Sequence, residues 1–383
     1  MPSYSGVWNL VSQMQAVAAG NWPAPPVEGG LWSWGSGGSG SLGLSSTTNR
    51  SSPVQVGALT SWAYASSGNY TSLAVLTDGT LFAWGDNQYG GLGQANIINR
   101  SSPVQVGALT QWSKVVVGRG QVAAIKGDKT LWVWGKNNNG QLGLNNVVYL
   151  SSPVQVGTLA NWSQVAAGQN HCVAVKTDGT LWAWGLNGSG QLGQNNTVSR
   201  SSPVQIGALT NWAQVAAGGY FCLAVKTDKT LWAWGSNGGG QLGTGNIYNR
   251  SSPVQVGALT NWGQSSAGSG SSFCVKTDGT LWSWGNNDYG QLGLSDNGYG
   301  TGRSSPTQVG SLTSWINVSG SSQKCAAIRS GGTLWTWGRN NSGQLGLGNT
   351  VDRNSPVQVG TLTTWVHLAR MNFAASTFAI KKP

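Results

Sequence analysis

Few side chains in this 383-residue chain are of the types that perform catalysis. The two histidines, His171 and His367, stand far apart, and the one glutamate is Glu28. No nucleophile motif accompanies the histidines, and no Cys/His spacing is typical of zinc. The Gly-rich loops lack the Lys-Ser/Thr ending of a phosphate loop. We therefore predict a protein that is not an enzyme and holds no cofactor or metal.

Cations recur at two regular positions. Lys and Arg number 21 against 10 Asp and Glu, so the net charge is +11. The basic residues are scattered and form no run, so we do not expect nucleic acid as a partner. The sequence contains a repeated unit, described below, and one position of this unit holds arginine in six of its seven copies and Leu150 in the remaining one. The arginines are Arg50, Arg100, Arg200, Arg250, Arg303 and Arg353. The other holds Lys126, Lys176, Lys226, Lys276 and Arg329. The arginines could grip phosphate or carboxylate groups, or each could bind a neighbouring loop carbonyl, and both interpretations stay open.

An internal repeat sets this spacing. The block L-[WF]-x-W-G occurs seven times, at intervals of 50 residues and once of 53: Leu31–Gly35, Leu81–Gly85, Leu131–Gly135, Leu181–Gly185, Leu231–Gly235, Leu281–Gly285 and Leu334–Gly338. A block S-P-[VT]-Q-[VI]-G also recurs seven times, each followed by a tryptophan: Trp62, Trp112, Trp162, Trp212, Trp262, Trp315 and Trp365. Repeats of this length are typical of stacked supersecondary units.

Each unit predicts four short strands. In one copy they are Trp162–Ala167, His171–Lys176, Thr180–Trp184 and Pro203–Ile206, with the turn Thr177-Asp178-Gly179 between the second and third. Seven such units predict an all-β, seven-bladed β-propeller of four-stranded antiparallel blades. We expect the Ala-rich first strand to lie innermost, where only small residues fit, and the two cation rings to lie on opposite faces.

The chain ends predict closure of the ring. The last unit stops after its second strand, and the first L-W-x-W-G is a third strand with nothing before it. Residues 365–381 and 30–35 together complete one blade, so N-terminal and C-terminal strands pair and no sheet edge stays open. The predicted domains are an N-terminal arm with a Pro-rich linker, residues 1–28, and the propeller, residues 29–383.

The cysteines and the hydropathy add two expectations. Cys172, Cys222, Cys274 and Cys325 occupy one strand position in different repeats, too far apart for disulfides, so we predict buried thiols. No stretch approaches the ~20 apolar residues of a membrane span, and no signal peptide is visible.

The repeat resembles the regulator of chromosome condensation repeat family. The family's pattern stands here as Trp162–Gly168, His171, Ala174–Val175, Asp178–Gly185, Asn187 and Gly190–Gly193. The resemblance covers about residues 29–383 and implies a seven-bladed propeller. It implies no single activity, because members include a GTPase exchange factor that binds chromatin, parts of ubiquitin ligases and a secreted β-lactamase inhibitor. The chain lacks a basic N-terminal tail and an inserted β-wedge, so nucleotide exchange is not expected.

The first 28 residues resemble a leader found on virion-associated proteins of aquatic bacteriophages. The match to S-G-V-W-x-L-x-x-Q-x-Q-A-V-x-x-G-x-W-P begins at Ser5. The resemblance implies a virion anchor made by Trp8, Leu10, Gln13, Gln15, Val17, Trp22 and Pro23. The alternative is an arm that packs on the propeller.

Differences among the seven copies indicate where recognition could lie. They concentrate between the first and second strands, in loops that should ring the channel mouth on the arginine face. The predicted partner-binding residues are Asn69, Tyr70, Arg119, Gln121, Gln169, Asn170, His171, Tyr220, Phe221, Gln323, Lys324, Asn372 and Phe373. Neutral drift would explain the same variation.

These features lead to three functional hypotheses. The first is a bacteriophage virion protein, assembled in the host cytoplasm, that contacts other virion proteins through residues 1–28. Its propeller would serve as decoration or as an adhesion module for a host surface glycan or protein. The second is a soluble regulator or inhibitor that binds one partner protein through the loops. The third, an enzyme on a propeller scaffold, has the least support.

Overall fold

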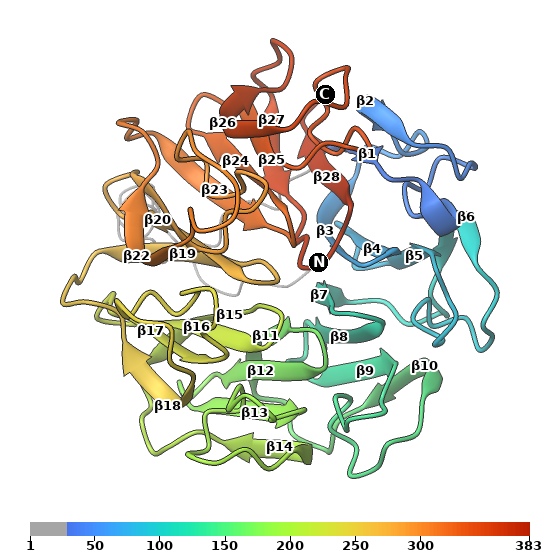
Figure 1. Cartoon of the computed structure of the whole chain (residues 1–383). Coiled ribbons are helices and arrows are strands. Elements are labelled where there is room, and N and C mark those ends of the chain that lie inside the picture. Colours follow the sequence, from blue (N-terminus) through green and yellow to red (C-terminus); the bar gives the residue numbers. More distant parts are fainter. Residues whose placement is uncertain (1–28) are drawn as a thin grey trace, which may run out of the picture.

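The computed structural model describes residues 29–383, which form seven four-stranded sheets arranged around one axis (Figure 1). The all-β, seven-bladed propeller with antiparallel blades is thereby confirmed. No helix in this range is long and apolar enough to cross a membrane. The predicted anchor lies outside the described residues: Trp8, Leu10, Gln13, Gln15, Val17, Trp22 and Pro23.

The blades share one plan, in which the first strand of a blade lies at the axis and the fourth at the circumference. The closing blade contains β27 (Trp365–Leu368), β28 (Ser376–Lys381), β1 (Gly30–Gly35) and β2 (Arg50–Gln55). The next three contain β3 (Trp62–Gly68), β4 (Thr71–Leu76), β5 (Leu81–Gly85) and β6 (Arg100–Gln105); β7 (Trp112–Val117), β8 (Gln121–Lys126), β9 (Leu131–Gly135) and β10 (Leu150–Gln155); and β11 (Trp162–Ala167), β12 (His171–Lys176), β13 (Leu181–Gly185) and β14 (Arg200–Gln205). The last three contain β15 (Trp212–Ala217), β16 (Phe221–Lys226), β17 (Leu231–Gly235) and β18 (Arg250–Gln255); β19 (Trp262–Ala267), β20 (Ser271–Lys276), β21 (Leu281–Gly285) and β22 (Arg303–Gln308); and β23 (Trp315–Gly320), β24 (Lys324–Arg329), β25 (Leu334–Gly338) and β26 (Arg353–Gln358). A short 3₁₀ helix, η1, spans Gly38–Gly40.

The fourth strand differs from the sequence prediction. It spans Arg200–Gln205 rather than Pro203–Ile206, because Arg200 pairs with Gly185 across an irregularity in the β13–β14 register. This strand carries Pro203, which cannot donate to a ladder, and it therefore lies at the sheet edge.

Ring closure occurs as predicted. β1 pairs with β28 over six residue pairs, from Gly30↔Lys381 to Gly35↔Ser376. β28 in turn pairs with β27. The two ends of the described chain thus form one sheet, which joins the last blade to the first.

The main contact between blades is made by the second tryptophan of each L-[WF]-x-W-G block. Trp184 is fully buried, and its Nε1–H donates to the carbonyl of Gln141 in the preceding blade at 2.9 Å. Five other blades repeat the bond: Trp84 to Ser41, Trp134 to Gly91, Trp234 to Gln191, Trp284 to Gln241 and Trp337 to Gln291. Trp34, in the closing blade, has no such bond within residues 29–383.

Glycine is required where that tryptophan meets the neighbouring loop. Gly143 has φ +71°, and a Cβ atom there would lie 2.9 Å from Trp184 Nε1. The indole therefore packs on bare backbone. Within its own blade, Trp184 also lies edge-on to Trp162, with ring centroids 6.0 Å apart.

The lysine ring belongs to this aromatic core. Lys176 Nζ lies 3.7 Å from the Trp182 ring centroid and 5.0 Å from that of Trp162. Lys226 and Lys276 repeat the arrangement on their own tryptophans. These contacts are cation–π interactions that stabilise the blades in which they occur, whereas the blade of β3–β6 has Leu76 at this position. Lys176 pairs with Trp162 and Arg200 with Gly185, at opposite ends of the blade, so the two cation rings lie on opposite faces as predicted.

The cysteines are buried free thiols, as predicted. Burial raises the pKa of Cys172 and of Cys274 to about 12, so neither forms a thiolate readily. His171 Nε2 lies 3.2 Å from Cys222 Sγ across a blade boundary.

We predict that Gly143→Ala destabilises the chain by about 2 kcal/mol, because the residue has positive φ and its methyl group would displace Trp184. Urea unfolding followed by tryptophan fluorescence measures the change. Gly188→Ala is the matched control, since a Cβ there meets nothing within 4 Å, and it should change stability by less than about 0.5 kcal/mol. Equal stability of the two variants would contradict the role given to Gly143.

Candidate functional site

The loops that vary among the repeats share one face with the arginines. His171 pairs with Gly185, and Gly185 pairs with Arg200, so the first-to-second and third-to-fourth connections lie at the same end of each blade. We call this end the loop face. The turns that carry Asp178 and its equivalents lie at the other end.

The structure divides the predicted partner-binding residues by exposure. Seven have side chains that are exposed or partly exposed on the loop face: Asn69, Tyr70, Arg119, Gln169, Tyr220, Gln323 and Phe373. Asn170 and Asn372 are almost fully buried.

Four predicted residues require correction. Gln121, His171, Phe221 and Lys324 stand at one repeat position, the first residue of a second strand, and are at most 3% exposed. Their side chains fill the space between blades; Gln121 Nε2, for example, donates to Gly168 O at 2.8 Å. They support the loops from below and do not reach a partner from the surface of the free chain.

Four predicted residues with exposed or partly exposed side chains lie together around one hollow of about 300 Å³ on the loop face: Asn69, Tyr70, Gln323 and Phe373. The buried Lys324 also lines this hollow. Arg339 borders it, donating from Nη1 to Gln323 Oε1 at 2.6 Å while its guanidinium lies 4.8 Å from the Tyr289 ring. No carboxylate of residues 29–383 lines the hollow. Its amides, hydroxyls, aromatic rings and arginine suit a protein segment or a glycan. Arg119, Gln169 and Tyr220 lie on other blades and do not join it.

A second feature of the loop face was not predicted. The connections between third and fourth strands expose apolar side chains, of which Tyr299 is 102%, Tyr248 70% and Ile97 66% exposed. We call these residues the apolar rim: Ile97, Ile98, Val147, Val148, Tyr149, Val198, Ile247, Tyr248, Tyr299 and Val351. The sequence does contain a pattern that could have predicted the apolar rim: a pair of apolar residues stands shortly before the repeated arginine, in loops that are otherwise polar.

The arginines themselves do not converge. Each begins a fourth strand at the circumference, so one small anion cannot bridge them. Arg303 forms an ion pair with Asp296 and donates to the Thr301 carbonyl, which agrees with the loop-binding interpretation at that position. Arg100 Nε and Arg250 Nε are buried without a partner in residues 29–383.

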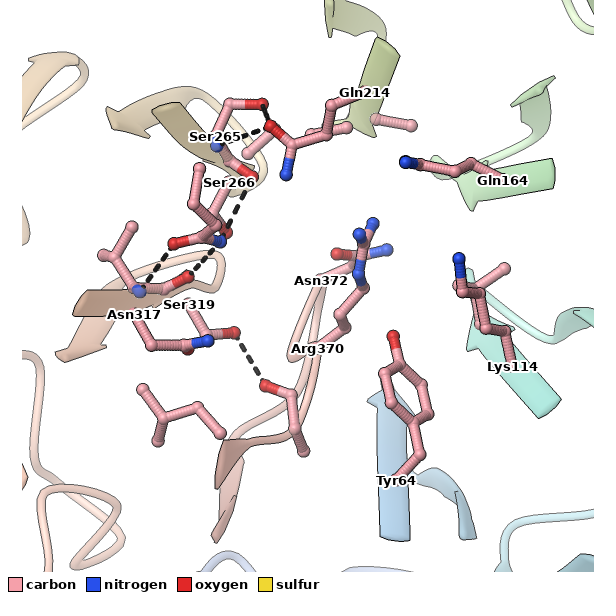
Figure 2. A pocket seen from close by; sticks show the side chains of 18 of the residues that line it. Tyr64, Lys114, Gln164, Gln214, Ser265, Ser266, Asn317, Ser319, Arg370 and Asn372 are labelled. Atoms are coloured by element: carbon pink, nitrogen blue, oxygen red, sulfur yellow. Dashed lines mark hydrogen bonds between the residues drawn. The ribbon is translucent and has the colours of Figure 1, made fainter. Parts of the chain in front are cut away.

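The channel at the axis corrects another expectation. The first strand is innermost, but the side chains that face the axis are not small. Long polar side chains line a central cavity, one from each blade at the position two residues after the tryptophan. Figure 2 shows Tyr64, Lys114 and Gln164 among them. These residues are Tyr64, Lys114, Gln164, Gln214, Gln264, Asn317 and His367. Alternation along the strand and variation among the repeats could have identified this position.

The segment after β27 closes the channel at the loop-face end. Arg370 pairs with Ser66 of β3, and Asn372 Nδ2 donates to the last carbonyl of β11, Ala167 O, at 2.7 Å. The cavity thus formed measures about 190 Å³. Among the described residues, no three His, Cys, Asp or Glu side chains converge as they would to hold a metal ion.

Comparison with known proteins agrees with this geometry. A model of the RCC1-like domain matches residues 6–272, and a model of the regulator of chromosome condensation (RCC1) repeat matches residues 278–328 and 331–369. The chain belongs to the RCC1-like repeat family. No curated protein sequence matches it significantly.

Solved RCC1-like propellers share the fold at low identity. Yeast RCC1 (Prp20), solved bound to Kap60, is 20% identical, with a TM-score of 0.83 over 93% of this chain and 90% of that one. Human WBSCR16 is 22% identical, with a TM-score of 0.81 over 93% and 99%. Prp20p from Saccharomyces cerevisiae, studied for its binding to Gsp1p and histones, is 20% identical, with a TM-score of 0.80 over 92% of each chain. These likenesses establish the fold alone.

Lys324 lies beneath the loop-face hollow, and no carboxylate of the described residues forms an ion pair with it. Its Nζ donates to Ser376 O at 3.1 Å and lies 3.5 Å from Met371 Sδ. Burial lowers the pKa of Lys324 to about 7 from the usual 10.5. Because the folded-state pKa is depressed, protonation of Lys324 opposes folding fully below pH 7, and this cost is relieved as the pH rises toward 10.5.

We predict that Lys324→Met stabilises the chain at pH 7 by about 2 kcal/mol, since it removes a buried unpaired cation. The difference from the wild type should shrink between pH 7 and pH 10. Urea unfolding of both proteins across this range measures it. If the two proteins had the same free energy of unfolding at pH 7 and the same dependence of it on pH, burial of the Lys324 ammonium would carry no penalty.

Proposed function

We propose that this RCC1-like propeller is a non-enzymatic binding protein whose loop face docks on a partner protein or a surface glycan. The observation that carries the proposal is the apolar rim, which exposes Ile, Val and Tyr side chains on blade after blade of a rigid scaffold. Exposed apolar side chains interspersed with arginine are typical of protein interfaces. The hollow lined by Tyr70 and Gln323 adds a polar pocket to the same face.

In its specific form, the proposal places the chain in a bacteriophage virion. Residues 1–28 would bind other virion proteins, and the propeller would be displayed as decoration or as a host-attachment module. The resemblance of the leader to virion-associated proteins supports this role. The particle would be assembled in the host cytoplasm.

A second candidate is a soluble regulator or inhibitor that uses the same face. The support for it is that Prp20, a propeller of the same fold, was solved bound to Kap60. Such a regulator would keep its partner after removal of residues 1–28, whereas a virion protein would lose incorporation.

Replacing apolar side chains of the apolar rim by threonine should weaken partner binding without affecting the fold. The first repeat already carries Thr47-Thr48 where three other repeats carry Ile97-Ile98, Val147-Val148 and Ile247-Tyr248. Replacing these three pairs by Thr-Thr should lower adsorption of the labelled chain to host cells about tenfold or more, because interface hot spots are few and apolar.

Ile316→Ser is the matched control for the rim variant. Ile316 is exposed near the start of β23, toward the opposite face, and the equivalent residues Ser113 and Ser163 show that serine fits there. The control should bind like the wild type. Unchanged adsorption of the rim variant would remove the apolar rim from the interface.

Mass spectrometry of purified particles from the source tests the virion role separately. We expect the chain at a fixed ratio to the major capsid protein, and we expect a chain lacking residues 1–28 to be excluded from particles. Absence of the full chain would overturn the virion role and leave the soluble regulator as the function to test.

A further inference from the structure

Two cations that line the axial cavity have no counter-charge among residues 29–383. Lys114 projects into it from β7, and Arg370 from the segment that closes the channel (Figure 2). No aspartate or glutamate of the described residues lines the cavity. Burial, and after it the charges of Arg370 and Lys129, lower the pKa of Lys114, so Lys114 and Arg370 repel each other.

Protein groups satisfy these cations poorly. Within residues 29–383, the Arg370 guanidinium makes one hydrogen bond, a 3.5 Å contact from Nη1 to Val215 O. Lys114 Nζ donates once, to Ser163 O at 3.1 Å. Since a guanidinium offers five N–H donors and an ammonium three, most of their donors have no acceptor among residues 29–383.

A neighbouring amide is oriented to add a donor. The backbone N–H of Ser265 donates to Gln214 Oε1 at 3.0 Å, and the Ser265 hydroxyl donates to the same oxygen at 3.2 Å. A backbone N–H can only donate, so the amide oxygen of Gln214 must face β19. Its Nε2 group is therefore turned toward the cavity, as Figure 2 shows.

His367 adds no positive charge at neutral pH. Burial and the Arg370 charge lower its pKa to about 4, so the ring is neutral at pH 7. Tyr64, whose ring centroid lies 5.2 Å from that of His367, brings a hydroxyl to the same space. The lining thus combines two cations with neutral donors, a set that suits an oxyanion.

We propose that the axial cavity binds a small oxyanion, such as phosphate or sulfate, between Lys114, Arg370 and Gln214. The cavity volume of about 190 Å³ holds such an ion together with water. The ion would neutralise two adjacent cations and use donors that the protein leaves open. The site lies at the axis, is closed from the loop face by Arg370–Asn372, and is independent of the function proposed for that face.

Isothermal titration of the full chain with sodium phosphate at pH 7.4, and separately with sodium sulfate, tests the site. Chloride holds the ionic strength constant. We expect saturable binding at one site per chain, weakened at least about tenfold in Arg370→Gln and in Lys114→Gln, because each removes one charge-assisted contact. The thermal midpoint of each variant without ligand checks that it is folded, and phosphate should raise the midpoint of the wild type but not that of Arg370→Gln or Lys114→Gln.

Lys229→Gly is the matched control. Lys229 is an exposed cation on the end of the propeller opposite the loop face, outside the cavity lining, and the equivalent residues Gly179 and Gly279 show that glycine fits its turn. This variant should bind like the wild type. Absence of saturable binding of both anions, or equal weakening by Lys229→Gly, would overturn the proposal.

Discussion

The packing of an indole on the bare backbone of the preceding blade is the contact on which the rest of the structure depends. Trp184 on the loop of Gln141 and Gly143 is one example, and the bond recurs around the ring. It requires a flat aromatic donor on one blade and a residue without Cβ at positive φ on the other. Each blade supplies an indole for one neighbour and a glycine for the other. The blades can therefore stack in one order only, and every contact is made only when the ring is complete. The closing blade satisfies that condition with two chain ends, β28 beside β1.

Meeting this requirement in every repeat leaves other positions free to change. The loop face and the axis-facing position of the first strand differ from copy to copy. The second tryptophan of each L-[WF]-x-W-G block and the glycine equivalent to Gly143 are the same in all seven copies. At the axis, that freedom allows Lys114 and Tyr64 to stand where Gln164 stands in another blade. On the loop face, it allows Thr47-Thr48 in one blade and Ile247-Tyr248 in another. A rigid ring thus presents two chemically different surfaces, a loop face with apolar and arginine side chains and an axial cavity lined by two cations.

The repeat made most of the fold predictable. The first two strands and the closing blade follow from a pattern that occurs seven times, and the Asp-Gly turns and the buried thiols follow from positions that recur in three and four of the repeats. The fourth strand was misplaced because its pairing begins at Arg200, before the Pro203 that breaks the ladder. The site was harder to predict, because variation alone does not distinguish an exposed loop from an inter-blade filler. Gln121 and Phe221 vary like surface residues, yet a buried position between blades accepts any side chain of fitting shape. The axial cavity depends on the curvature of the whole ring, which no single repeat encodes.

A site-saturation scan of the whole chain, with the fraction of folded protein as the readout, tests whether the repeated Trp–Gly contact holds the ring together and leaves the apolar rim and the axis-facing residues free for binding. The account predicts that Trp184, Gly143 and their equivalents accept almost no substitution, whereas Tyr248, Tyr299 and Gln164 accept most. Rim or axial positions as intolerant as the tryptophans would contradict it, because their side chains would then be retained for folding rather than for recognition.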